Sequence, residues 1–391
     1  MNDADIARYR ALFPVLERVT YLNPGTYGPL STRVADALRE WTTMLELEGP
    51  YSPIAEQRGH DAYEATRAKL AGLLGAEPSE IALTRSVTDG TNIVAHGLRW
   101  QPGDEIILSD KEHESGWVNW QVAAQRHGAT VKVLALANDE EELLRRLEAL
   151  LTPRTRIVFM SHVSCITGLR IPAARLAKLV HDRGALFMLD GAHGAGQIPV
   201  DVRALGCDFY TGCGHKWLMG PQGTGYLYIA KERLEEVEPV WVGWGSRAAG
   251  KGPGDAQLVW AEGNRRFECA TRLWGIYAAL GVAVDLIQEV GVERIEARVR
   301  ELVGPFKREL AALPGMELQT PHAPHLSAGL VRLSFRGYDH DQLARRYEDQ
   351  RMLFQYSRFE DGAQTIRFAV AYFMRPEELQ RALDFLRRCA P

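Results

Sequence analysis

From about residue 30 onward, short apolar runs alternate with longer segments of amphipathic helical character. The apolar runs are IALTRS, DEIILSD, TVKVLAL, RIVFMSH, ALFMLD and TGYLYIA, and helical segments such as EEELLRRLEALL and PAARLAKLVHDRG separate them. Strands that alternate with helices are typical of βαβ units, in which the strands pair in parallel. The pattern therefore predicts an α/β fold built on a mainly parallel sheet.

Polar residues follow four of the predicted strands, at the point where each strand ends. The segments are ALTRSVTDGTN, ILSDKEHES, VFMSHVSCITG and FMLDGAHGAG. Ligands of parallel α/β sheets bind outside the carboxyl ends of the strands. We therefore expect the four segments to converge on one crevice that holds the functional site.

The pattern changes towards the C-terminus. The segment GIYAALGVAVDLIQEVGVERIEARVRELVGPFKREL is predicted to be helical with a break near Gly291, and LVRLSFRG, TIRFAVAYF and PEELQRALDFLRRC after it indicate a smaller α+β unit. Independent units of this size are common in chains of such length. We therefore place a large domain at residues 20–280 and a small domain at residues 281–391, with residues 1–19 packing back on the small domain.

Composition excludes several classes of protein. The 391 residues are 46% hydrophobic, which suffices for a full core, and the net charge of −4 provides no basic stripe for nucleic acid. No apolar run approaches the roughly 18 residues of a membrane span, and the charged N-terminus lacks a secretion signal, so we expect a cytoplasmic protein. The five cysteines form no CxxC pair, which argues against a disulfide framework and a metal site.

The stretch DFYTGCGHKWLMGPQGTGYLY, residues 208–228, places Lys216 between glycine-rich turns, and Asp190 ends a predicted strand before it. Pyridoxal phosphate (PLP) requires a lysine that forms an imine, an acid beside its ring nitrogen, a stacking side chain and phosphate donors. Burial favours the neutral, reactive amine. Taken alone, Lys216 could be an ordinary solvated lysine and Asp190 the cap of a helix. The combination of the two favours a PLP site. A nucleotide site is disfavoured because GAHGAGQ lacks the GxGxxG spacing.

The stretch DGAHGAGQIPVDVRALGCDFYTGCGHKWLMGPQGTGYLY resembles the PLP site of class V aminotransferases, the group that includes cysteine desulfurases, isopenicillin N epimerase-like proteins and cysteine/cystine C–S lyases. Further matching pieces, in order, are YLNPGTYGPLS, SVTDGTN, KEHESGWVNWQ, SHVSCITG, RRFECAT and TIRFAVAYFMRPEEL. The resemblance covers nearly the whole chain. It implies the PLP-dependent transferase fold of type I, with a mainly parallel seven-stranded sheet in the large domain and a smaller α+β C-terminal domain.

The resemblance also implies roles at the cofactor ring. Lys216 would be the Schiff-base lysine and the proton carrier at the substrate Cα, and Asp190 would pair with the ring nitrogen. His113, which follows Glu112, would stack on the ring. His193 would lie beside the phenolic oxygen.

The phosphate of the cofactor would be held by a helix start and by two further side chains. Val87, Thr88 and Asp89 would open a helix whose N–H groups, with the Thr88 hydroxyl, bind the phosphate. His215 would add a contact. Thr271 would reach the phosphate of a partner subunit, which implies a homodimer with active sites at the interface.

The substrate would be an L-α-amino acid, a small molecule. Arg367 matches the arginine that binds the α-carboxylate, a role suited to a planar guanidinium. Thr26 and Tyr27 would lie near the substrate. Trp241 and Trp244 would line the entrance from the partner subunit or, as we favour, pack at the interface.

Three departures from the family pattern bear on the reaction. Residues 331–367 contain no cysteine, whereas cysteine desulfurases carry a reactive one there, so desulfurase chemistry is disfavoured. Cys213 stands where relatives have a phosphate-binding hydroxyl, and we expect a small buried side chain. Cys165 stands where desulfurases often have an asparagine, and Thr167 is a candidate to line the site instead.

The sequence therefore favours a PLP-dependent C–S lyase that eliminates the β-substituent of a cysteine-type substrate. Transamination or epimerisation of an amino acid is the alternative within the same family, because the three reactions share one carbanion. A cofactor-binding protein without turnover is disfavoured by the presence of both Lys216 and Arg367.

Overall fold

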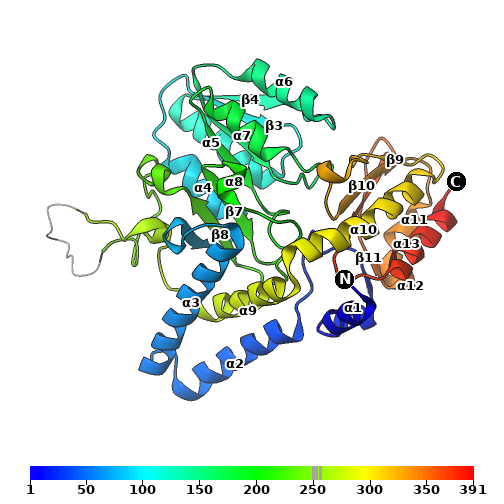
Figure 1. Cartoon of the computed structure of the whole chain (residues 1–391), viewed down its shortest axis with the longest axis horizontal. Helices are drawn as coiled ribbons and strands as arrows, with labels where there is room; N and C mark the ends of the chain where they lie inside the picture. Colours follow the sequence, from blue (N-terminus) through cyan, green and yellow to red (C-terminus); the bar gives the residue numbers. More distant parts are fainter. Residues whose placement is uncertain (249–253, 255–257) are drawn as a thin grey trace.

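The larger unit of the molecule is built on a seven-stranded sheet. The computed structural model describes residues 1–248, 254 and 258–391. The strands lie in the order β2-β8-β7-β6-β5-β3-β4, and β8 alone in this sheet runs antiparallel to its neighbours. Their bounds are β2 (Ile81–Thr84), β3 (Glu105–Ser109), β4 (Thr130–Leu134), β5 (Thr155–Ser161), β6 (Leu186–Asp190), β7 (Phe209–Cys213) and β8 (Gly225–Ile229). The predicted α/β fold with a mainly parallel sheet is confirmed (Figure 1).

Strand β7 is the member of this sheet that the alternating pattern missed. Its sequence, FYTGC, contains a threonine and a glycine, and it returns to β8 through residues 214–224 without an α-helix. The helix–strand alternation therefore carries no signal for it. The return loop contains Lys216, so β7 sets the position of that side chain.

Both faces of the sheet are buried, as expected for parallel strands. Side chains alternate along each strand, so Ile107 joins the cluster that contains α6 and α7, and its neighbour Ile106 joins the cluster that contains α4 and α5. The helices of this unit are α4 (Val87–Gly97), α5 (Val118–His127), α6 (Glu140–Leu150), α7 (Ala173–His181) and α8 (Val202–Leu205). The carboxyl ends of the parallel strands remain as the edge at which polar side chains collect.

Three longer helices pack beside this unit: α2 (Thr32–Glu48), α3 (Pro53–Leu74) and α9 (Trp274–Val290). A serine is the N-cap of each of the helices α2 and α3. Ser31 accepts a hydrogen bond from Val34 N, and Ser52 accepts one from Ala55 N. The chain bends by 71° between α9 and α10 (Val292–Ala311), where Gly291 has a φ of 87°. The predicted break near Gly291 is confirmed.

The smaller unit is a four-stranded antiparallel sheet in the order β12-β13-β10-β9, covered by helices (Figure 1). Its strands are β9 (Glu317–Leu318), β10 (Leu330–Phe335), β12 (Gln355–Arg358) and β13 (Gln364–Ala369). Its helices are α10, α11 (His340–Ala344), α12 (Arg346–Gln350) and α13 (Pro376–Cys389). Arg332 of β10 pairs directly with Arg367 of β13, which places both side chains on one face of this sheet.

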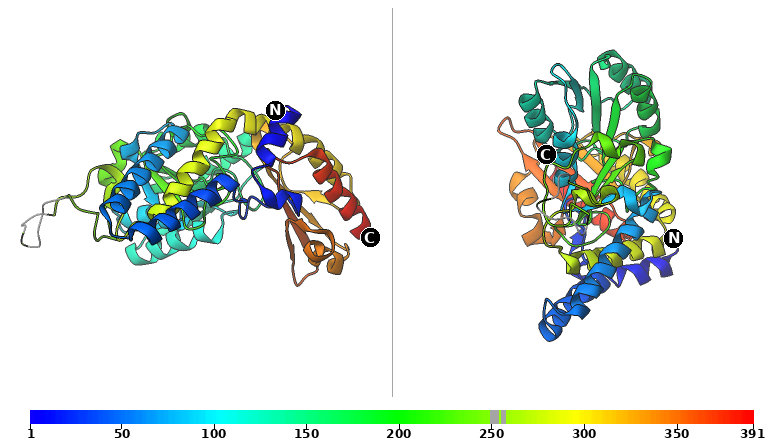
Figure 2. Two further views of the ribbon diagram at one scale, coloured as in Figure 1. Left: turned by 90° about the horizontal axis from the view of Figure 1, so that it is seen from below. Right: turned by 90° about the vertical axis from the view of Figure 1, so that its left-hand side faces the viewer.

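The N-terminal segment lies beside α13 (Figure 2). Arg10, the last residue of α1 (Asp3–Arg10), forms a buried ion pair with Glu378, and Phe13 packs on Phe373 with ring centroids 4.8 Å apart. The short strand β1 (Thr20–Tyr21) then pairs in parallel with β11 (Met352–Leu353). Residue 280 falls inside α9, and the division at residues 20–280 and 281–391 stays a prediction.

No single helix in the described part of the chain is long and apolar enough to cross a membrane; the bent pair α9 and α10 meets the length and composition criteria only when taken together. The remaining elements are short 3-10 helices: η1 (Pro14–Glu17), η2 (Pro78–Glu80), η3 (Glu114–Gly116), η4 (Lys231–Glu236), η5 (Gly263–Phe267) and η6 (Pro324–Leu326).

Candidate active site

The polar segments that follow β2, β3, β5 and β6 lie side by side at one edge of the sheet. Glu112, after β3, accepts hydrogen bonds from Ser161 N at 3.1 Å and Ser161 Oγ at 2.5 Å at the end of β5. His162 N donates to Asp190 O at 2.8 Å, which joins β5 to β6. Val87, at the start of α4 after β2, packs with Ala192 and Cys213. The predicted convergence of the four segments is confirmed.

Lys216 and His193 meet at this edge. Lys216 Nζ lies 3.3 Å from His193 Nε2, and the indole Nε1 of Trp217 donates to His193 Nδ1 at 3.0 Å. Burial, with nearby positive groups, lowers the pKa of His193 well below its usual value, so its ring is neutral. Because Nδ1 accepts from the indole, the ring proton is assigned to Nε2 and points to Lys216.

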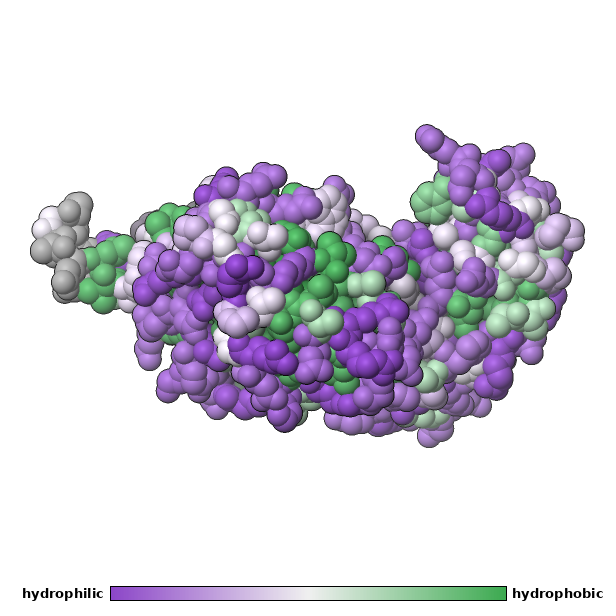
Figure 3. Space-filling view, turned by 90° about the horizontal axis from the view of Figure 1, so that it is seen from above, coloured by the Kyte–Doolittle hydropathy of each residue, from purple (hydrophilic) through white to green (hydrophobic). Residues whose placement is uncertain are grey.

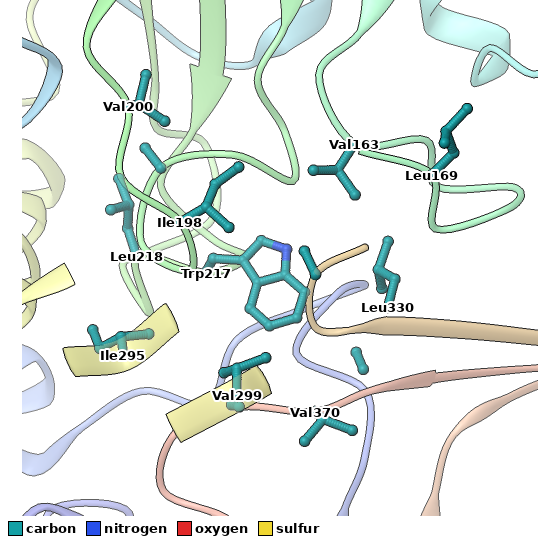
Figure 4. Close-up of a cluster of buried hydrophobic side chains, with 14 of the residues drawn as sticks. Val163, Leu169, Ile198, Val200, Trp217, Leu218, Ile295, Val299, Leu330 and Val370 are labelled. Carbon is teal, nitrogen blue, oxygen red and sulfur yellow. The ribbon is translucent and has the colours of Figure 1, made fainter. Parts of the chain in front are cut away.

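Trp217 holds the loop that carries Lys216. Its side chain is 2% exposed and lies in a hydrophobic cluster that joins both units of the molecule (Figure 4). Around it the figure labels Ile198, Val200 and Leu218 of the large unit, Ile295 and Val299 of α10, and Leu330 and Val370 of the small unit. The residue after Lys216 is therefore fixed by packing, which limits the motion of the amine.

A second chain segment closes over the same loop. Gly28 N donates to His215 O at 2.7 Å, and a Cβ at Gly28 would lie 2.1 Å from Lys216 O. No side chain fits there without displacing backbone. The glycine in NPGTYGPL is therefore required by the close approach of this segment to the lysine loop.

Asp190 ends β6 and is buried. Its Oδ1 accepts a hydrogen bond from Ala192 N at 2.8 Å, while burial raises the pKa of the carboxyl, an effect that the Ala192 N–H and Lys216 oppose. A buried carboxylate of this kind gains from a cationic partner such as a protonated ring nitrogen. The position fits the predicted partner of the PLP ring.

Glu112 and His113 occupy the end of β3. Ser109 and Ser161 donate to the Glu112 carboxyl, yet complete burial raises its pKa to about 7. These bonds fix the backbone before His113, whose side chain is exposed and whose Nδ1 accepts from Ser115 N at 3.2 Å. Desolvation lowers the pKa of His113. An exposed neutral ring anchored at Nδ1 is available to stack on a cofactor.

The start of α4 and His215 form a candidate phosphate site. Ser86 Oγ caps Asp89 N at 3.2 Å, and the exposed Thr88 lies in the first turn with its hydroxyl and backbone N–H. His215 Nδ1 is buried and, among the described residues, has no hydrogen-bond partner. Burial lowers the pKa of His215 to about 4, so the neutral ring offers one N–H. These donors fit the phosphate of PLP.

Cys213 does not take the place of a hydroxyl donor. It is 5% exposed, packs against Val87 and Ala192, and burial raises the pKa of its thiol to about 11. The residue therefore fills a small apolar gap between β7 and the start of α4, as expected for a buried thiol. Cys165 is buried as well, and burial raises the pKa of its thiol.

Arg367 lies on the small-unit side of the site. Its Nη2 donates to Thr26 Oγ1 at 2.8 Å and its Nη1 to Cys165 O at 3.3 Å, while its buried Nε has no hydrogen-bond partner in the described part of the chain. Within the described residues no carboxylate lies within 4.0 Å of this guanidinium, and Arg367 as a whole is 7% exposed. A buried cation without a counter-ion fits an anionic substrate group.

Sequence reasoning missed two residues here. Arg332, opposite Arg367, also has a buried Nε without a partner in the described structure. Gln197 accepts from Gly329 N at 2.9 Å and donates to His193 O at 2.6 Å, which ties the small unit to the histidine loop. Arg332 could have been found from the sequence, because it is an arginine inside the apolar run LVRLSFRG. No feature of the sequence marks Gln197.

The remaining predicted residues lie at the surface of the single chain. Thr271 is exposed, and no hydrogen bond in the described structure joins it to the residues above. Tyr27 is 48% exposed and its ring lies 5.5 Å from that of His215. Trp241 and Trp244 are 74% and 71% exposed. Among the described residues, no group of three or more His, Cys, Asp or Glu could bind a metal.

The chain is similar in sequence to a known family and to enzymes of known activity. The model of the family "Aminotransferase class-V" matches residues 34–355. The chain is 35% identical to isopenicillin N epimerase of Streptomyces clavuligerus over 94% of both chains, and 34% identical to a cysteine desulfurase of Cronobacter sakazakii over 81% of this chain and 80% of the relative.

Two solved structures are similar over almost the full length. A lysine-to-alanine mutant of C-DES with glycine covalently linked to its PLP cofactor superposes with a TM-score of 0.90 at 32% identity, covering 97% of this chain and 99% of that one. The cystine C–S lyase C-DES in complex with its product cysteine persulfide gives a TM-score of 0.89 at 33% identity, covering 97% and 100%.

Proposed function

Since the chain belongs to the class V aminotransferase family and is a PLP-dependent enzyme, we propose that it acts as a C–S lyase, eliminating the β-substituent of a cysteine-type L-α-amino acid. The observation that carries this proposal is that Lys216, beside His193, and Arg367, which has no carboxylate partner among the described residues, lie at one site, while residues 331–367 contain no cysteine. Bound PLP would supply the electron sink for the carbanion at Cα.

Arg367 would bind the substrate carboxylate. Thr26 already occupies one of its N–H groups, and Thr26 Oγ1 in turn donates to Asn23 Oδ1 at 2.8 Å. This orients the guanidinium and leaves further N–H groups for a carboxylate. The substrate is thereby held with its Cα at the carboxyl edge of the large sheet.

Lys216 would then take the Cα proton. His193, which is held by Trp217, would keep Nζ in place for this transfer. The Cβ–S bond breaks, and the sulfur leaves with the bonding electrons as a thiolate or persulfide. The released enamine reacts with water to give pyruvate and ammonia.

Cysteine desulfurase activity, known for several relatives, needs an accessible thiol that attacks the substrate sulfur. Cys165 and Cys213 are buried, and burial raises the pKa of each thiol. A buried, protonated thiol is a poor nucleophile. These features disfavour sulfur transfer to Cys165 or Cys213 and support the proposal of elimination.

Epimerisation is the second candidate. A relative that is 35% identical is an isopenicillin N epimerase, and this likeness supports the candidate. Epimerisation returns a proton to the opposite face of Cα and breaks no C–S bond. The two reactions therefore differ in their products.

The test incubates the PLP-loaded enzyme with L-cystine, cysteine conjugates and simple amino acids in deuterated water. Elimination predicts pyruvate and ammonia in equal amounts with the sulfur substrates. Loss of chirality with deuterium at Cα and no pyruvate would contradict the proposal and favour epimerisation. An amino acceptor converted with keto-acid formation would indicate transamination.

We also propose that the enzyme is a homodimer whose active sites lie at the interface. Large apolar side chains are exposed at Leu47, Tyr51, Trp241 and Trp244, with exposed fractions of 77%, 85%, 74% and 71%. Figure 3 shows hydrophobic side chains on one face of the large unit and beside the grey residues. Such exposure is typical of protein–protein contacts. Thr271 would reach the partner's cofactor phosphate across this contact.

Light scattering during size-exclusion chromatography tests the dimer. Trp241→Arg is expected to shift the protein toward monomer and to weaken PLP binding, because Thr271 would lose its target. Val133→Arg, at a residue 61% exposed on the edge strand β4, is the control. A wild-type monomer with full activity would contradict this proposal.

A further inference from the structure

A cavity of about 280 Å³ lies on the small unit, between the N-terminal segment and the start of α13. The first helices of the chain and α13 flank this region (Figure 2). Its walls come from residues 10–20, 350–351 and 375–381. None of the residues assigned to the PLP site lines it. It is therefore a separate feature, formed by three segments far apart in the sequence.

Positive charge dominates the lining of this cavity. Five arginines line it, and two glutamates, Glu17 and Glu378, are the acids among the lining residues, which leaves an excess of three positive charges. The arginines are Arg10, Arg18, Arg351, Arg375 and Arg381. The start of a 14-residue helix, α13, adds a partial positive charge.

One of the five arginines is neutralised within the protein. Arg10 is buried and donates to both carboxylate oxygens of Glu378, at 2.7 and 3.1 Å, as well as to Leu16 O at 2.8 Å. Glu378 also accepts from Arg375 N at 2.9 Å. This pair is satisfied and forms a neutral part of the cavity wall.

The other four arginines have no anionic partner among the residues that the structure describes. Across the described ranges 1–248 and 258–391, no carboxylate lies within the 4.0 Å of an ion pair from Arg18, Arg351, Arg375 or Arg381. Some surface arginines are paired, for example Arg39 with Asp36 and Arg175 with Glu140, whereas Arg126, Arg308 and Arg388 also have no ion pair in the described structure. The four arginines here differ from those in that they surround one cavity. Four exposed guanidinium groups around one cavity repel one another unless an anion lies between them.

The backbone at Arg351 is consistent with a function for this cluster. Arg351 has a φ of 49°, a left-handed conformation that favours glycine or asparagine, and it ends α12. Its carbonyl accepts from Thr20 N at 2.9 Å. The chain thus carries a charged side chain beside the cavity at a position where a smaller residue would fit the backbone better.

We propose that this cavity binds a small oxyanion that carries two or more negative charges. Guanidinium groups bind phosphate and carboxylate oxygens through paired hydrogen bonds, and 280 Å³ accommodates a small multivalent anion with its water. The site is distinct from the PLP phosphate site and does not depend on the reaction at Lys216.

Binding would fasten the N-terminal segment to the small unit. Arg381 Nη1 donates to Thr20 Oγ1 at 3.0 Å, and Thr20 begins β1, which pairs with β11. From β1 the chain runs directly to Asn23 and Thr26, the residues that orient Arg367. An anion between Arg18 and Arg381 would therefore stabilise the segment that supports the substrate-binding arginine.

The experiment uses the PLP-loaded enzyme after borohydride reduction, so that covalently held cofactor keeps the active-site phosphate position filled. Inorganic phosphate, pyrophosphate and citrate are titrated by calorimetry and thermal unfolding at constant ionic strength set with sodium chloride. At a hundred times the Kd, the unfolding midpoint is expected to rise by about 2 °C or more. The anion that binds most tightly distinguishes a phosphate from a carboxylate ligand.

Three variants locate the site. Arg18→Gln and Arg381→Gln are each expected to weaken binding by about tenfold, because each removes a charged hydrogen-bond donor. The Arg18 side chain makes no hydrogen bond or ion pair with any described residue, so its loss does not impair folding. Arg388→Gln, on the same helix but outside the cavity, is expected to bind as the wild type does.

Absence of binding for all three anions would overturn the proposal. So would equal binding by the wild type and by both Arg18→Gln and Arg381→Gln, since binding would then lie elsewhere. Loss of binding in all three variants would indicate a general charge effect and would also overturn it.

Discussion

Two lysines in this chain, Lys216 and Lys307, lie in enclosed surroundings and have opposite neighbours. Lys307 Nζ lies 2.6 Å from Pro321 O, 3.2 Å from His322 O and 2.9 Å from Ser327 Oγ. Lys216 Nζ instead lies 3.3 Å from a ring nitrogen of His193. Lys307 therefore has three oxygen acceptors around its amine, whereas the hydrogen-bond partner of Lys216 is a histidine ring at the carboxyl edge of the large sheet. The neighbours, more than burial, separate a structural lysine from a reactive one.

The two lysines also differ in the parts of the molecule that their hydrogen bonds connect. Lys307 connects α10 to the loop before β10 within the small unit. Lys216 is connected through His193 and Gln197 to Gly329, and through Trp217 to the core between the units. A change at Lys307 should therefore alter stability, and a change at Lys216 should alter chemistry.

The largest effect is expected for Lys216→Ala. It removes the amine that binds the cofactor and accepts the Cα proton, so activity should fall by at least about a thousandfold. The visible absorbance of lysine-bound PLP should be absent as well. Lys231→Ala, at an exposed lysine, is the control and should retain both. A Lys216→Ala protein with wild-type turnover would remove the distinction between the two lysines.

Arg367→Gln should have the next largest effect. The loss of charged hydrogen bonds to the substrate carboxylate should lower kcat/KM by about a hundredfold, mainly through KM. Steady-state kinetics measure this split. Arg358→Gln, an exposed arginine on β12, should leave KM unchanged. An equal loss in both variants would mean that general charge, and not the position of Arg367, attracts the substrate.

Trp217→Phe should lower kcat by about tenfold with little change in KM, because it keeps an aromatic ring but removes the N–H that fixes the His193 tautomer. The matched control is Trp120→Phe, whose buried indole N–H has no partner in the described structure. Nitrogen-15 chemical shifts of His193 should show mixed tautomers in Trp217→Phe. An unchanged tautomer would contradict the assigned role of Trp217.

Lys307→Met should have the smallest effect on turnover. It leaves three acceptors unsatisfied, so the free energy of unfolding should fall by about 1–3 kcal/mol while kcat stays unchanged. Lys178→Met, at a lysine whose side chain is 76% exposed, is the stability control. Loss of kcat without loss of stability would contradict the structural role assigned to Lys307.

The same variant tests the pH dependence of stability. Burial lowers the pKa of Lys307 from 10.5 to about 8, so between these values the unfolded chain binds more protons than the folded one. The contribution of Lys307 to stability should therefore rise with pH across this window. The difference in unfolding free energy between wild type and Lys307→Met, measured at both ends, should grow toward high pH.

Much of the fold followed from local pattern. Six strands of the large sheet and the break at Gly291 were visible because periodicity and glycine act over a few residues. The convergence of strand ends followed from parallel pairing. β7 was missed because no helix separates it from β8.

The contacts that distinguish this site could not be predicted from the sequence. Trp217 donates to His193 and Gln197 bridges to Gly329 through side-chain directions that no spacing encodes. Cys213 is an apolar filler because Val87 and Ala192 surround it, which only packing decides. The arginine-lined cavity combines three distant segments, none of which is unusual by itself.

The most direct test of the central claim is borohydride reduction of the PLP-loaded wild-type enzyme, followed by proteolysis and mass spectrometry of the labelled peptide. The contrast between the two lysines predicts one phosphopyridoxyl group per chain, attached at Lys216, with the peptide that contains Lys307 unmodified. A label at Lys307, or none at Lys216, would contradict it.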